Sequence, residues 1–219
     1  MSRRKLALEC SLVTLFLFLF VAALHLLPLP SGLLRFGNAL LTPGWILLPW
    51  ILLTLHGEPF ENFGYHLNDL RRSIGTGLLV SVLLLVPYFL LYRFWIGKPS
   101  LHFGNGHETA RWLKMCLYQF TVIALPEEFY FRGYLQTRLN RIWGRPHHLF
   151  GAPFGPGLIV TSLIFMFFHL LLAVNLWNVG IFFSALVFGW LREKTDSIIA
   201  PILFHALSNI ALFSFQGRF

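Results

Sequence analysis

The chain has 219 residues, of which 56% are hydrophobic and only 12% are charged, and its formal net charge is +8. Soluble domains carry roughly 25% charged residues, so this composition excludes an ordinary soluble globule, a disordered chain, a collagen-like repeat and a disulfide scaffold. Together with a mean hydropathy of +0.67, it predicts an all-α polytopic membrane protein, that is, a bundle of transmembrane helices.

The apolar stretches predict about seven spans, because about 20 apolar residues are needed to cross a bilayer. No A-x-A cleavage site follows the first stretch, so we expect an uncleaved anchor rather than a signal peptide. The fourth span begins near residue 111 and continues past Pro126, and a loop rich in Gly, Pro and His follows it at 144–157. The predicted spans are 12–29, 40–55, 74–95, 111 to beyond 126, 158–174, 177–191 and 198–215.

Basic residues cluster before the first span and after the second, fourth and sixth spans. The positive-inside rule therefore places the N-terminus and these loops in the cytoplasm and the C-terminus outside. Four basic residues fall on the opposite side in this arrangement: Arg93, Lys98, Arg111 and Lys114. Because apolar spans separate the clusters, they form no continuous basic surface, and we expect no nucleic-acid partner.

Two of the nine acidic residues lie inside an apolar segment, LYQFTVIALPEEFYF. These are Glu127 and Glu128. A charge near the bilayer centre costs several kcal/mol, so such residues usually face a cavity and carry function. The alternative is that Pro126 and the two glutamates simply open a new helix. The other acidic residues are expected in loops (Glu58, Glu61, Asp69, Glu108, Glu193) or at span edges (Glu9, Asp196).

Helical geometry separates the two glutamates. Neighbouring helical residues point about 100° apart, so we do not expect both side chains to project into one site. Glu128 precedes Arg132 by four residues, which places the two on one face as an ion pair. Glu127 then has no local partner, which makes it the candidate general base.

Polar residues also interrupt two later apolar helices. His169 lies four residues after Phe165, and His205 and Asn209 lie four apart on one helical face. A single membrane histidine is more often a packed residue with one hydrogen bond, but a His/Asn pair is less readily explained in that way. One glutamate, two histidines and an asparagine suffice to hydrolyse an amide, because they can activate water, position it and stabilise the oxyanion.

These motifs, Glu127-Glu128-x-x-x-Arg132, Phe165-x-x-x-His169 and His205-x-x-x-Asn209, occur in this order along the chain, each on a separate predicted span. The sequence thereby resembles the CAAX protease and bacteriocin-processing family, the Abi-type glutamate intramembrane endopeptidases, over about residues 111–212. The resemblance implies a helical membrane protease in which Glu127 activates water with help from His169. It implies further that His205 and Asn209 form the oxyanion hole and that Glu128 and Arg132 support the glutamate helix.

From this resemblance we expect accessory helices in residues 1–110 and a catalytic core in residues 111–219. The expected partners are the lipid bilayer, as a multi-pass protein of a bacterial inner (plasma) membrane, and a membrane-associated peptide or protein substrate. Prenylated CAAX proteins, bacteriocin precursors and C-terminal sorting tails are all compatible substrates. No cofactor and no metal are expected.

Other classes of membrane protein make different demands on the sequence. The only His-Glu pair, His107-Glu108, is not followed by the second histidine of a zinc motif. A Gly-x-Ser-Gly serine motif is absent, and the only aspartates are Asp69 and Asp196. A metal held by Glu127 and the two histidines stays open, as does a non-proteolytic scaffold. A transporter would carry matching polar sites in both halves, which the first three spans lack.

Overall fold

The computed structural model describes residues 2–96, 107–172 and 175–216. Lys98, most of the polar segment before the fourth span and the last two residues of the fifth predicted span lie outside the described residues. The last three residues of the predicted catalytic core, 217–219, also lie outside them.

Each of the seven predicted spans corresponds to a helical stretch, so the all-α architecture is confirmed. Among the described residues, three helices, α1 to α3, are long and apolar enough to cross a membrane, and α7 and α9 are shorter apolar helices. The protein is therefore an integral membrane protein. The helices are α1 (Arg3–Leu26), α2 (Ser31–Leu55), α3 (Leu70–Ile96), α4 (His107–Tyr118), α5 (Leu125–Glu128), α6 (Thr137–Trp143), α7 (Pro156–Leu172), α8 (Ile181–Thr195) and α9 (Ile199–Gln216).

Several helix ends differ from the predicted ones, and three of the differences have a clear physical reason. Helix α1 begins at Arg3, where Ser2 caps its first turn, because the basic residues continue the helix beyond the apolar stretch. Helix α2 begins at Ser31 and includes both Pro43 and Pro49, since prolines are tolerated in membrane helices whose neighbours satisfy the freed backbone groups. Helix α8 begins late because Leu176–Gly180 forms a short 3-10 helix, η4.

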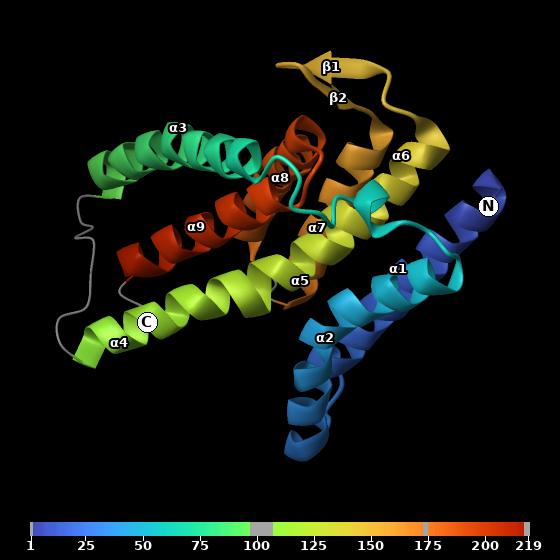
Figure 1. The fold of residues 1–219 in the computed structure, drawn as a ribbon. Coiled ribbons are helices and arrows are strands. Elements are labelled where there is room, and N and C mark those ends of the chain that lie inside the picture. Colours follow the sequence, from blue (N-terminus) through green and yellow to red (C-terminus); the bar gives the residue numbers. More distant parts are fainter. Residues whose placement is uncertain (1, 97–106, 173–174, 217–219) are drawn as a thin grey trace.

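The fourth span is one continuous rod that crosses the molecule from α4 to α6 (Figure 1). Two π-helical segments, η2 (Gln119–Ala124) and η3 (Phe129–Gln136), flank the short α5. π-Helical turns widen a helix locally and are frequent at functional sites. The two adjacent glutamates therefore lie where the helix is least regular.

The remaining helices surround this rod. Helix α9 packs against α3 and α8, and α7 packs against α8 and α6, while α1 and α2 cover the other side (Figure 1). A short 3-10 helix, η1 (Phe60–Phe63), lies between α2 and α3. Buried aromatic rings from several helices form the core around the rod, among them Phe63, Tyr130, Tyr134, Phe131, Phe165, Phe168 and Phe188.

The loop at 144–157 contains a small antiparallel hairpin, β1 (His147–Leu149) and β2 (Ala152–Phe154). Helix α8 holds it, because the Trp190 indole and the Lys194 ammonium donate hydrogen bonds to carbonyls of the hairpin turn, at 2.9 and 2.7 Å. The loop assignments of Glu108 and Glu193 were wrong, since both lie in helices. Glu193 is almost fully buried there and pairs with Arg145 at 2.7 Å, because α8 continues past its apolar part.

Candidate active site

Three of the predicted site residues meet at one point inside the bundle. Glu127 lies on α5, His169 near the end of α7 and His205 on α9. The Oε2 atom of Glu127 is 4.0 Å from Nε2 of His169 and 3.9 Å from Nε2 of His205. Within the described part of the chain, this buried oxygen has no hydrogen-bond partner. Polar atoms separated by this distance are too far apart for a direct hydrogen bond but can share one water molecule.

The ring of His169 is oriented by its own helix. Its Nδ1 lies 3.0 Å from the carbonyl oxygen of Phe165 one turn earlier, and a carbonyl can only accept, so Nδ1 carries the proton. In the neutral imidazole, Nε2 is then an acceptor, and it faces Glu127. The Phe165 ring, 4.5 Å away between centroids, packs against the imidazole.

Glu128 forms the expected pair with Arg132, and it also binds His205. Its Oε1 accepts from the Arg132 guanidinium at 3.1 Å and lies 2.8 Å from Nδ1 of His205. Neither Glu128 nor Arg132 is exposed at all. The two glutamates are nevertheless connected, because the imidazole of His205 presents one nitrogen to each carboxylate.

Arg132 is held by more than this carboxylate. It donates to the carbonyl of Ala185 at 3.2 Å, and its guanidinium lies 4.3 Å from the ring centroid of Phe165 and 4.9 Å from that of Phe188. The ring of Phe188 also stacks on His205 at 4.7 Å. The ion pair, the histidine and these two rings thus form one buried unit behind Glu127.

Asn209 lies one turn beyond His205, where its side chain is held by a residue that the sequence analysis missed. Its amide donates to Oε1 of Gln119 at 2.9 Å, and Gln119 is buried in the π-helical segment η2. This hydrogen bond uses one of the two side-chain amide protons of Asn209 and leaves the second proton available to another acceptor. A glutamine within an apolar stretch, eight residues before Glu127, was the available signal.

Two contacts from outside the matched motifs support the irregular rod. Pro126 has no N–H to bond the carbonyl of Val122, and the Thr42 hydroxyl of α2 donates to that carbonyl at 3.5 Å instead. Beyond the glutamates, the Tyr65 hydroxyl donates to the carbonyl of Phe129 at 2.7 Å, and the two rings stack at 3.8 Å. Neither residue carries a signal in the sequence, because both contacts join distant segments.

Tyr65 can approach this closely only because Gly133 has no side chain. A Cβ at Gly133 would lie 2.2 Å from the Tyr65 ring. Within the described residues, no group of three or more His, Cys, Asp or Glu side chains is arranged to hold a metal ion.

The fold and this cluster define a class: an integral membrane protein with a glutamate, two histidines and an asparagine gathered inside a helical bundle. Residues 109–211, a segment that includes all four residues, match the family model described as "Type II CAAX prenyl endopeptidase Rce1-like". The chain is therefore a membrane peptidase of the CAAX endopeptidase class. The comparison with curated proteins found no match, and neither did the comparison with solved structures.

Proposed function

We propose that the protein is a glutamate-dependent intramembrane endopeptidase that hydrolyses a peptide bond in a membrane-associated peptide or in the terminal segment of a membrane-anchored protein. The observation that carries this proposal is the position of Glu127, whose free carboxylate oxygen lies within 4.0 Å of two histidine nitrogens. The match of this segment to the model of a peptidase family supports the reaction class.

The proposed reaction starts with a water molecule between Glu127 and His169. Glu127 takes a proton from this water as it attacks the carbonyl carbon, while the acceptor nitrogen of His169 orients the second water proton. The C–O bond forms, and the carbonyl oxygen becomes an oxyanion. Glu127 then gives its proton to the leaving nitrogen as the C–N bond breaks, so the products are a carboxylic acid and an amine, and proton transfer between them leaves a carboxylate and an ammonium group.

The oxyanion is stabilised by donors on α9 in this proposal. Asn209 has one amide proton left after its bond to Gln119. His205 donates from Nε2 only when both ring nitrogens carry protons, because Nδ1 already donates to Glu128. A preorganised donor of this kind contributes roughly 10²–10³ in rate.

Exposure distinguishes the roles of the two glutamates. The side chains of Glu127 and His169 are 16% and 24% exposed, whereas those of Glu128 and Arg132 are fully buried. Substrate and water can therefore reach Glu127 but not Glu128. We assign Glu128 and Arg132 to positioning, since they fix His205 and the glutamate helix without meeting the substrate.

The description of the matched family names prenylated CAAX substrates, and we propose a substrate of this general kind, a terminal segment delivered from the membrane. We infer further that the membrane is the inner membrane of a bacterium, which the resemblance to bacteriocin-processing proteins favours.

The function is tested by comparing the peptide termini of the cell envelope between a strain with the wild-type protein and one with Glu127→Gln. Termini that stay uncleaved only in the variant identify a peptidase and its substrate. Identical profiles contradict the proposal and favour a non-proteolytic scaffold. Loss of the cleavage in wild-type membranes treated with a strong chelator would instead show a metal-dependent hydrolase.

A further inference from the structure

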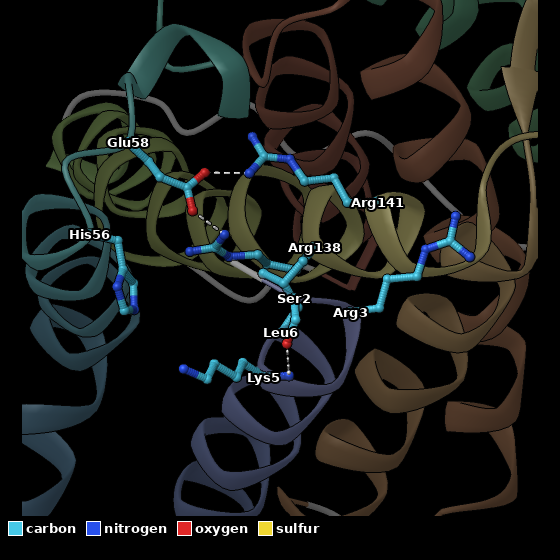
Figure 2. A pocket seen from close by; sticks show the side chains of 8 residues that line it. All are labelled: Ser2, Arg3, Lys5, Leu6, His56, Glu58, Arg138 and Arg141. Carbon is cyan, nitrogen blue, oxygen red and sulfur yellow. Dashed lines mark hydrogen bonds and ion pairs between the residues drawn. The ribbon is translucent and has the colours of Figure 1, made fainter.

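A basic cavity lies at the end of the bundle where α1 begins, α2 ends and α6 passes (Figure 2). Its volume is about 730 Å³, which is enough for a phosphate-bearing headgroup. Arg138 in its wall is ten residues after Glu128, or about 15 Å along the rod. The cavity is therefore separate from the candidate active site.

Positive charge dominates this cavity. Arg3, Lys5, Arg138 and Arg141 line it, against a single lining carboxylate, Glu58. Figure 2 shows Glu58 between Arg138 and Arg141, with an ion pair to each. Glu9 is a second carboxylate that pairs with Arg138 from behind the cavity wall. When it is counted with Glu58, two of the four positive charges remain uncompensated. The cavity therefore suits an anion.

The two uncompensated positive charges are those of Arg3 and Lys5, which lie at the mouth of the cavity. Arg138 is fully buried and fixed by its ion pairs, whereas Arg3 and Lys5 are exposed. Within residues 2–96, 107–172 and 175–216, neither Arg3 nor Lys5 has an ion-pair partner. The first turn of the 24-residue helix α1 adds its backbone N–H groups and the positive end of its dipole.

An apolar stripe begins directly below the mouth. Lys5 shares one face of α1 with Leu8, Leu12, Leu15 and Leu19, which follow it at helical spacing. These four leucines are 61%, 57%, 53% and 58% exposed. A free phosphate would use only the cavity, but a phospholipid would use both the cavity and the stripe.

We propose that this cavity binds the phosphate headgroup of an anionic membrane lipid, whose acyl chains lie along the leucine stripe of α1. Basic pockets between membrane helices on the cytoplasmic side bind such headgroups, and a neighbouring cavity that shares Arg141 with this one is also lined by Arg145 and Arg192.

Native mass spectrometry of the purified full chain, with added phosphatidylglycerol or phosphatidylcholine, tests this proposal without reference to peptidase activity. We expect one retained phosphatidylglycerol per chain and little phosphatidylcholine. Arg3→Gln and Lys5→Gln should each weaken retention roughly fivefold, the effect of one cationic side chain near a charged lipid surface. Arg4→Gln is the matched control, since Arg4 is exposed and adjacent but does not line the cavity.

Three results would overturn the proposal. The first is equal retention of the two lipids, and the second is a loss on Arg4→Gln as large as the losses on Arg3→Gln and Lys5→Gln. The third is displacement of phosphatidylglycerol by an equal concentration of glycerol phosphate, which would assign the cavity to a soluble phosphate ester.

Discussion

The buried pair of Glu128 and Arg132 offers a quantitative test of how the site is held. The substitution Glu128→Gln keeps the shape and an acceptor oxygen but removes the negative charge. Arg132, which is not exposed at all, then keeps its positive charge inside the bundle without its hydrogen-bonded carboxylate partner. Removing one partner of a buried pair costs about 3–5 kcal/mol.

The structure places the expected loss at the lower end of this range. The Arg132 guanidinium keeps the carbonyl of Ala185 and the faces of Phe165 and Phe188, and such cation–π contacts compensate for part of the lost attraction. We therefore expect Glu128→Gln to lower the free energy of unfolding by about 3 kcal/mol. For a chain of this size, that corresponds to a fall of about 6–12 °C in the unfolding midpoint.

The double variant Glu128→Gln/Arg132→Met shows whether charge is the cause. Replacing both partners of a buried pair with uncharged groups is often nearly neutral, so most of the loss should be recovered, apart from about 1 kcal/mol for the weakened hydrogen bond to His205. The assay is thermal unfolding of the purified protein in detergent, and exposed Glu61→Gln is the control. An unpaired buried charge is not the cause if Glu128→Gln unfolds like that control, or if the double variant is less stable than the single one.

Three further predictions concern the surroundings of the site. Gly133→Ala should destabilise the protein by about 1–3 kcal/mol in thermal unfolding, because the new Cβ would overlap the ring of Tyr65. Gly75→Ala is the control, since Gly75 lies at an open helical position and should tolerate the substitution without loss. Equal effects of the two substitutions would contradict the prediction. Gln119→Leu removes the acceptor that holds Asn209 and should lower kcat by up to about 10²-fold in a cleavage assay, and an unchanged kcat would be evidence against that positioning. Burial raises the pKa of Glu58, but hydrogen bonds from two arginines outweigh it and hold the pKa below its ordinary value of 4.5. The stability that Glu58 contributes is therefore present above that pH and is lost as the pH falls through the lowered pKa. Wild type and Glu58→Gln should differ in unfolding midpoint at pH 7 and converge in strong acid, and a pH-independent difference would contradict this prediction.

The helices were predictable because membrane spans can be recognised in a sequence by their length and apolar composition. The ends were less predictable, since α2 continues through Pro43 and Pro49 and begins nine residues before the predicted start. Proline breaks helices in water more readily than in a bundle whose neighbours supply the missing donors. The donor that Thr42 offers to the rod is such a case, and nothing near Thr42 in the sequence indicates it.

The residues of the site were predictable from their types and spacing, but their connections were not. Glu9 was expected at a span edge, and the sequence did not indicate its partners: it accepts from the Tyr134 hydroxyl at 2.6 Å and pairs with His56 at 2.6 Å. The bond between Gln119 and Asn209 joins positions 90 residues apart. Such contacts depend on how distant helices pack, which the periodicity of one segment does not encode.

The central claim is that Glu127 activates the water that cleaves the peptide. The most direct measurement is cleavage of a fluorescence-quenched, farnesylated CAAX peptide by the purified protein in lipid vesicles, with wild type, Glu127→Gln and the surface control Glu61→Gln compared at equal amounts of folded protein. We expect cleavage by wild type and by Glu61→Gln and none by Glu127→Gln. Cleavage by Glu127→Gln at the wild-type rate would contradict it.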